Sequence, residues 1–308
     1  MALCSTARAS LNDHPTGDLV LYEHFYKLRE PPFTLTPDPA FLYRSRQHDF
    51  AMTLLRYGIV SQASFCLLSG EVGSGKTLLV RQLLNSLEQE IRVGLISNTS
   101  RQFGRLLPWV CLAFDLPGDG KDDAALYRLF VEFVTREHGA GRRAVLIVDE
   151  AQNLSAEMLE ELRVLSNINA DKQIALQIFL VGQPELRDTL RLPQLRQFAQ
   201  RISVDYHLVP LSLAEAQAYV RHRLSVAGGD PDLISAAAVD LAHASSAGIP
   251  RLINQLCDTA LVYGFSDQRP GIDAELMAQV IADRTSGGIF PAAVSSGAPF
   301  TPAPATAL

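Results

Sequence analysis

The segment Gly70–Thr77, which reads GEVGSGKT, limits most strongly what this chain can fold into. An apolar run, Phe65–Ser69, precedes it, and leucines at helical spacing follow it between residues 77 and 90. The pattern G-x-x-x-x-G-K-[ST] between a strand and a helix is typical of a phosphate-binding loop, because glycines let backbone N–H groups wrap around phosphate oxygens. The following helix N-terminus adds a favourable dipole. The sequence therefore predicts a nucleotide-binding P-loop.

Two side chains of this loop have the chemistry to act on a nucleotide. We expect Lys76 to reach the β- and γ-phosphates and the hydroxyl of Thr77 to bind Mg²⁺. The nucleotide is expected to be ATP. The residues predicted to hold it are Gly70, Glu71, Val72, Gly73, Ser74, Gly75, Lys76, Thr77 and Leu78.

A second apolar run, VLIVDE, ends in the two carboxylates Asp149 and Glu150. A buried parallel strand presents such residues at its carboxyl end, where the sites of α/β proteins lie. We expect Asp149 to hold Mg²⁺ through water and Glu150 to act as general base on the attacking water. In isolation two acids after a strand would be interpreted as solvated, but after a P-loop the catalytic interpretation is favoured.

One glutamine and three arginines complete the predicted site. Gln183 follows another apolar run and is placed to touch the γ-phosphate or orient the water, although a turn residue before Pro184 is the alternative. Arg251 opens a helix and is predicted to reach the nucleotide of its own subunit. Arg201, with Arg196 as the alternative, is predicted to reach the γ-phosphate of a neighbouring subunit in an oligomer. Each arginine could instead be a solvated surface charge.

Strands and helices alternate through the first two thirds of the chain, which predicts a parallel sheet covered on both faces. The predicted strands are Phe65–Ser69, Val93–Ser97, Ala144–Asp149, Ile174–Val181 and Ser203–Val209. After Pro210 the pattern is helical only, beginning with a capping box at Ser212 and Glu215. We therefore predict an α/β P-loop domain followed by a small all-helical lid. The expected boundaries are a flexible arm at 1–20, the ATPase domain at 21–210, the lid at 211–285 and a disordered Pro/Ala-rich tail at 286–308.

Composition limits the partners and the cellular location that we expect for the protein. The net charge of −6 disfavours nucleic acid as a general partner without excluding a local basic patch. No window approaches the length of apolar sequence that a membrane-spanning helix needs, and the four cysteines show no zinc or disulfide spacing. We expect a cytoplasmic protein, either free or held at the inner membrane through partners.

Several sequence blocks resemble the AAA+ superfamily and, within it, the ExeA/GspA-type general secretion ATPases. These blocks are PPFTLTPDPAF before the P-loop, then GEVGSGKT, VLIVDEAQNL, GQPEL and GIPR. The resemblance runs from about Leu21 to about Arg284. The P-loop and the acidic block are common to the superfamily, whereas the N-terminal, DEAQNL and GQPEL blocks point to the secretion group. That group includes pilus-biogenesis relatives and secretion ATPases found beside exosortase (PEP-CTERM) loci.

The resemblance implies roles for individual residues. Asp149 and Glu150 match the Walker B acids, Gln183 the first sensor, Arg251 the second sensor, and Arg201 or Arg196 the arginine finger. The first sensor is often Asn or Thr elsewhere in the superfamily, so the contact made by Gln183 stays open. ExeA/GspA proteins carry a membrane span and a peptidoglycan-binding region after the ATPase part. Because this chain ends in a Pro/Ala-rich tail, the shorter exosortase- or pilus-associated forms fit better.

Three functions remain open at this point. The first is a homo-oligomeric ATPase that drives or regulates assembly of a secretion, exopolysaccharide/exosortase or pilus system through protein partners. The second is a DNA-associated AAA+ helper of the transposition-regulator kind. The third, a nucleotide-gated scaffold that hardly turns over, is disfavoured by the presence of Glu150.

Overall fold

The computed structural model describes residues 22–36, 38–86, 90–97, 99, 104–170 and 173–287. Its larger part is built on a five-stranded sheet in the order β2-β3-β6-β1-β7, with every neighbouring pair parallel. The predicted α/β fold class is therefore confirmed, and the strands lie on the predicted apolar runs. They are β1 Phe65–Gly70, β2 Ile91–Ile96, β3 Arg143–Val148, β6 Leu176–Gly182 and β7 Ile202–Leu208.

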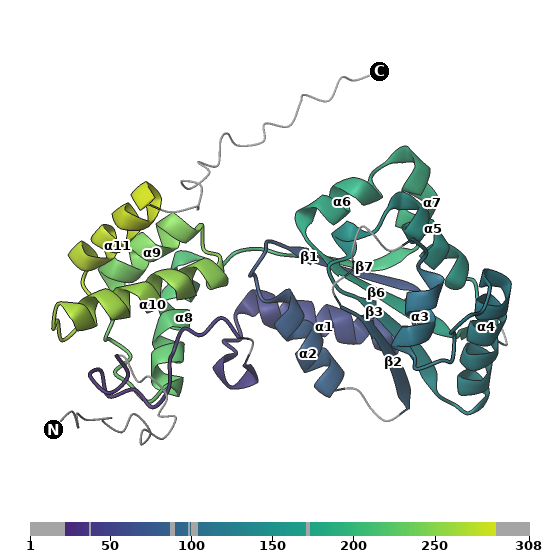
Figure 1. Cartoon of the computed structure of the whole chain (residues 1–308), viewed down its shortest axis with the longest axis horizontal. Coiled ribbons are helices and arrows are strands. Elements are labelled where there is room, and N and C mark those ends of the chain that lie inside the picture. The colour runs from purple at the N-terminus through teal and green to yellow at the C-terminus, as the bar shows by residue number, and fades with distance from the viewer. Residues whose placement is uncertain are drawn as a thin grey trace, which may run out of the picture.

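Helices cover both faces of this sheet (Figure 1). On β1, alternate side chains enter different cores: Cys66 and Leu68 pack with α1 and α2, whereas Phe65 and Leu67 pack with the helices of the other face. Burial on both faces explains why the three central strands are nearly continuous apolar runs, whereas the edge strands β2 and β7 also carry polar residues. One face carries α1 Arg46–Val60 and α2 Lys76–Asn85; the other carries α3 Leu107–Ala113, α4 Asp123–Gly139, α5 Ala156–Leu165, α6 Pro184–Leu190 and α7 Arg196–Ala199.

Short elements connect these layers. They are the 3₁₀ turns η1 Pro39–Phe41, η2 Ala151–Asn153 and η3 Pro193–Leu195, and an antiparallel pair formed by β4 Asn169–Ala170 and β5 Gln173–Ile174. Of these, η2 directly follows the acidic end of β3 and therefore belongs to the candidate site.

The helical lid follows the sheet domain. It consists of α8 Leu213–Val226, α9 Ala236–Ser246, α10 Pro250–Ser266 and α11 Ala274–Gly287. The predicted capping box is present, since Ser212 Oγ accepts from the Glu215 amide and the Glu215 carboxylate accepts from the Ser212 amide. α11 runs to Gly287, beyond the predicted end of the lid at 285. The predicted arm and residues 288–308 of the predicted tail lie outside the described residues. Among the described helices, none combines the length and apolar character needed to cross a bilayer.

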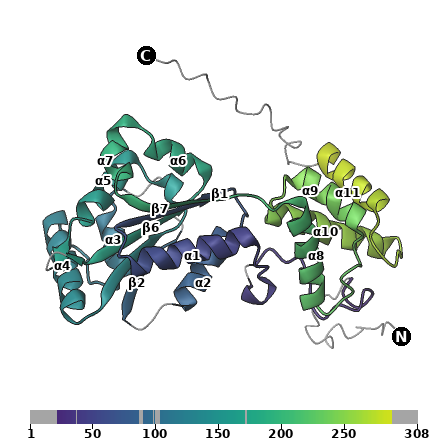
Figure 2. The same ribbon diagram turned by 180° about the vertical axis from the view of Figure 1, so that it is seen from behind.

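The segment that precedes α1 packs on the lid, and we call its described residues, 22–36 and 38–44, the strap (Figures 1 and 2). Its apolar side chains lie in one core with α8, α9, α10 and α11. The Tyr22 hydroxyl donates to Asp258, and the Tyr26 hydroxyl donates to the Arg269 carbonyl at 3.1 Å. The predicted boundary at residue 21 assigns this segment to the ATPase domain, whereas its side chains complete the core of the lid.

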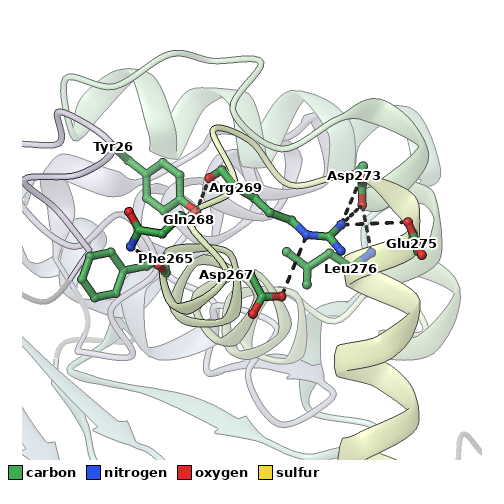
Figure 3. Close-up of polar contacts among 8 residues, drawn as sticks. All are labelled: Tyr26, Phe265, Asp267, Gln268, Arg269, Asp273, Glu275 and Leu276. Carbon is green, nitrogen blue, oxygen red and sulfur yellow. Dashed lines mark hydrogen bonds and ion pairs between the residues drawn. The ribbon is translucent and has the colours of Figure 1, made fainter.

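Figure 3 shows the corner of the lid where the strap is attached. The Arg269 guanidinium in the α10–α11 turn lies 3.4 Å from Asp273, 3.9 Å from Asp267 and 4.0 Å from Glu275. These carboxylates surround the guanidinium, and the backbone carbonyl of Arg269 accepts from the Tyr26 hydroxyl. The strap is thus held by backbone as well as side-chain groups of the lid.

A buried arginine of α8 fixes a second part of the strap to the lid. The Arg223 side chain is 7% exposed and donates to the Pro32 carbonyl at 2.5 Å, the Tyr219 hydroxyl at 2.9 Å and the Thr34 carbonyl at 3.4 Å. Its guanidinium lies over the Phe41 ring, 4.9 Å from the centroid. Buried cations need such acceptors, so the strap and Arg223 stabilise one another.

We expect Arg223→Met to lower the free energy of unfolding by about 1–3 kcal/mol, because two strap carbonyls lose a charged donor. Urea denaturation measures this value. The control is Arg221→Met on the same helix, an exposed residue paired with Asp232, which should change it by no more than about 0.5 kcal/mol. Equal effects of the two substitutions would contradict the role given to Arg223.

Candidate functional site

The candidate site is a cleft at the carboxyl ends of β1, β3 and β6, between the sheet domain, the strap and the lid. Such strand ends are where α/β proteins bind ligands. Its lining combines the P-loop with the strap and with the first turn of α10. The lining side chains discussed below are His48, Lys76, Thr77, Glu150, Gln183 and Arg251.

The P-loop has the backbone expected of a phosphate cradle. Gly73 and Gly75 have φ values of 82° and 101°, which only glycine adopts without strain. α2 begins within the loop, at Lys76, and no side chain caps its N-terminus, so its first N–H groups are left for a ligand. Of the predicted cradle Gly70–Leu78, the residues from Val72 to Leu78 line the cleft, whereas Gly70 and Glu71 do not and instead offer their carbonyls to Lys76.

The Lys76 side chain is buried against the loop itself. Its Nζ donates to the Gly70 carbonyl at 2.8 Å and to the Glu71 carbonyl at 2.9 Å. Burial lowers the pKa of Lys76, and the nearby carboxylates of Glu150 and Asp149 oppose that effect. Phosphate oxygens would offer this ammonium stronger acceptors than neutral carbonyls do.

Thr77 and Asp149, which are far apart in the sequence, meet in the structure. The Thr77 hydroxyl donates to Asp149 Oδ2 at 3.1 Å, and the Glu150 amide donates to Asp149 Oδ1 at 2.9 Å. Asp149 is buried, which raises its pKa, while these two hydrogen bonds act in the opposite direction. A hydroxyl and a carboxylate are hard oxygen ligands of the kind that Mg²⁺ takes beside phosphates, so the donor set fits that ion.

Glu150 stands at the end of β3 in a left-handed backbone conformation, with φ 55°. The Thr99 hydroxyl donates to its carbonyl at 2.6 Å. Its Oε2 accepts from Gln183 Nε2 at 3.2 Å and from Gln152 Nε2 at 2.6 Å. The structure therefore brings the predicted general base and the predicted sensor into direct contact.

Arg251 reaches the P-loop within the same chain. Its backbone N–H donates to the Gly73 carbonyl at 3.3 Å. A Cβ on Gly73 would lie 2.3 Å from the Arg251 Cβ, so only glycine allows this approach. The start of α10 is thus seated on the loop, and the contact of the Arg251 guanidinium with a nucleotide stays a prediction.

The other two predicted arginines lie away from the cleft. Arg201 donates to Ser166 Oγ at 2.9 Å and, more weakly, to the Arg163 carbonyl at 3.5 Å, which places its guanidinium at the C-terminal end of α5. Arg196 is exposed at the start of α7. Neither lines the site of its own chain, so their predicted role across subunits stays a prediction.

The sequence interpretation missed two polar residues of the site, Gln152 and Thr99, and considered a third, His48, only as a contact for the adenine ring. Gln152 bonds Glu150, Thr99 bonds the backbone after β3, and His48 bonds the P-loop. For Gln152 the sequence offers one signal, its position two residues after Glu150, which is close enough for the two side chains to meet. Thr99 and His48 come from other elements, so only the fold brings them here.

His48 is a buried contact between α1 and the P-loop. Its Nε2 donates to the Ser74 carbonyl at 3.1 Å, and its Nδ1 accepts from the Ser45 hydroxyl at 2.7 Å. The Ser74 carbonyl requires a proton on Nε2, and the Ser45 hydroxyl can donate to Nδ1 in the neutral ring that burial favours. Burial lowers the pKa of His48, while the Ser74 carbonyl and the more distant carboxylates of Glu215 and Asp49 act in the opposite direction.

Comparison with known proteins agrees with this geometry. Residues 59–190 match the family described as "AAA domain". The chain is 45% identical over 251 residues to general secretion pathway protein A of Aeromonas hydrophila. The match covers 80% of this chain and 45% of that protein, so the chain spans less than half the length of this curated relative.

Solved structures share the fold at low sequence identity. The Aeropyrum pernix ORC2 protein, solved in ADPNP–ADP complexes, has a TM-score of 0.60 at 16% identity, over 85% of this chain and 73% of that one. Cdc6p of Pyrobaculum aerophilum has a TM-score of 0.60 at 16% identity, over 78% and 67%. At such identities the likeness establishes the fold alone.

We expect the pH dependence of stability to report on His48. The unfolded state takes up a proton near pH 6.5, above the lowered pKa of the folded state, so stability is complete above about pH 6.5 and is lost as the pH falls. His48→Gln should reduce this loss, as measured by urea denaturation between about pH 7.5 and 5. The exposed His24→Gln serves as the control and should follow the wild type. An unchanged pH profile in His48→Gln would contradict the assignment.

Proposed function

We propose that this chain, a P-loop ATPase of the AAA+ type by its site and its similarity to general secretion pathway protein A, uses Mg²⁺-dependent ATP hydrolysis to drive or regulate a membrane-associated secretion machinery. The observation that carries the catalytic part is the hydrogen bond between Thr77 and Asp149. It joins the end of the P-loop to the acidic strand end, beside Lys76 and Glu150 in one cleft. A nucleotide in this cleft would meet the phosphate-binding, Mg²⁺-binding and general-base groups that phosphoryl transfer to water needs, and the remaining arginine would come from a neighbouring subunit.

Each residue has a role that follows from its position. Lys76 and the loop amides hold the phosphates, and Glu150 orients and deprotonates the attacking water. Thr77 and Asp149 would hold Mg²⁺, Asp149 through water. The ion would supply positive charge against the phosphate oxygens. Gln183 donates to Glu150, so a contact between Gln183 and the γ-phosphate would change the position of the general base.

The lid is the part that would move when ATP is bound and hydrolysed. α10 is seated on the P-loop through Arg251, and the strap attaches the lid to α1 as well. Nucleotide binding between these parts favours the arrangement in which the lid touches the loop, because a ligand stabilises the state that it contacts best. Loss of the γ-phosphate then weakens that arrangement.

The proposed partners are proteins of a secretion system, because the similar curated protein is named for the general secretion pathway. Exosortase-associated and pilus systems belong to the same proposal. A DNA-associated role is the alternative outcome: ATP-strengthened DNA binding that falls steeply with salt would favour it over secretion.

Two substitutions test the catalytic assignment. Lys76→Ala should weaken ATP binding, because the phosphates lose their buried cation. Glu150→Gln should bind ATP normally but hydrolyse it at least about 100-fold more slowly, because the amide cannot take a proton. Nucleotide binding by calorimetry and phosphate release measure the two effects. Wild-type turnover in Glu150→Gln would overturn the general-base role.

A mixing experiment tests the arginine that acts across subunits. We favour Arg196, because Arg201 is bonded to α5 of its own chain. Arg196→Ala should be nearly inactive with normal ATP affinity. Mixed equally with Lys76→Ala it should recover up to about a quarter of wild-type turnover, since that share of sites pairs an intact loop with an intact arginine. The same mixture with Arg201→Ala separates the two residues, and recovery there alone would transfer the role to Arg201.

A further inference from the structure

We propose that Gln152 is a positioning residue for hydrolysis, which fixes the Glu150 carboxylate to the end of the neighbouring strand β6. The inference rests on the proposed ATPase function and deepens it. Gln152 is not among the described residues that line the cleft, so it acts on the reaction through Glu150.

The side chain of Gln152 makes two hydrogen bonds in different directions. Its Nε2 donates to Glu150 Oε2 at 2.6 Å, and its Oε1 accepts from the Gln183 backbone N–H at 3.0 Å. Glu150 follows β3, whereas Gln183 follows β6, the strand paired with β3. One amide therefore connects the predicted base to the predicted sensor.

The orientation of this amide is determined by its partners. A carboxylate oxygen can only accept, and a backbone N–H can only donate. The nitrogen of Gln152 must therefore face Glu150, and its oxygen must face Gln183. A flipped amide would lose both bonds, so the side chain has one favourable arrangement.

Gly182 leaves the space that this arrangement needs. A Cβ on Gly182 would lie 3.0 Å from Gln152 Oε1, 3.3 Å from its backbone nitrogen and 2.8 Å from Leu186 Cδ2. A larger residue at the end of β6 would therefore press on the amide. Glycine at this position thus lets the end of β6 lie close to η2, which carries Gln152.

Glu150 needs an external support of this kind. Its backbone is fixed by Thr99 and by the bond from its own N–H to Asp149, but these bonds leave the direction of its carboxylate to be set by other partners. Gln152 and Gln183 both donate to Oε2, and the Gln152 bond is the shorter. A general base works only when it is held within reach of its proton, so loss of this bond should lower the rate of chemistry rather than nucleotide affinity.

Two substitutions of Gln152 separate its two bonds. Gln152→Met keeps the approximate volume and loses both, and we expect kcat to fall about 10- to 100-fold with the Kd for ATP within about 2-fold of the wild type. Gln152→Glu keeps an acceptor for the Gln183 N–H but loses the donor and places a second carboxylate against Glu150. It should be at least as slow. The exposed Gln194→Met is the matched control and should retain wild-type kcat.

A double substitution tests whether Gln152 acts through Glu150. Adding Gln152→Met to Glu150→Gln should lower the residual rate by less than about 2-fold, because the group that Gln152 positions is already removed. Multiplicative effects in the double variant would overturn the inference, as would an equal loss of kcat and ATP affinity, or a kcat that rises or stays unchanged in Gln152→Met. Absence of turnover in the wild-type protein would instead overturn the proposed function, and this inference with it.

Discussion

Strand order is the constraint on which the site depends. β6 lies between β1 and β3, and all three run in the same direction, so their carboxyl ends meet along one edge. The P-loop leaves from β1, the acids leave from β3, and Gln183 leaves from β6 between them. The hydrogen bonds of Gln183 and Gln152 to Glu150 follow from this order. Burial of the strands on both faces stabilises the order, because each strand contributes apolar side chains to two cores.

The second constraint is the way in which the lid is joined to the sheet domain. The chain passes from β7 to α8 at one place, and the strap passes from the lid surface to α1 at another. The lid therefore has two covalent connections, and α1 carries His48 to the P-loop at the end of the second. The proposed movement of the lid with nucleotide would therefore act on the P-loop through both α10 and α1.

Two buried cations of the molecule are satisfied in the same way. Lys76 and Arg223 are both nearly inaccessible, and both donate chiefly to backbone carbonyls. For Lys76 these acceptors belong to the P-loop, so the ammonium is hydrogen-bonded now and can exchange these carbonyls for phosphate oxygens when a nucleotide binds. In Arg223 they belong to the strap, so the cation is structural. Similar chemistry thus serves binding in one place and attachment in the other.

Local sequence patterns determined much of this protein. The P-loop, the acidic end of β3, the strands and the capping box of α8 were all predictable, because each depends on residues within a few positions of one another. The grouping of Lys76, Thr77, Asp149, Glu150 and Gln183 was predictable once the strands were expected to be parallel. Only the tertiary structure decided that the strap belongs to the lid core, that His48 supports the loop, that Arg201 is bonded to α5, and that Gln152 reaches β6. No local sequence pattern predicts these contacts, because the residues that they join come from different elements. The contacts form only when the elements pack together.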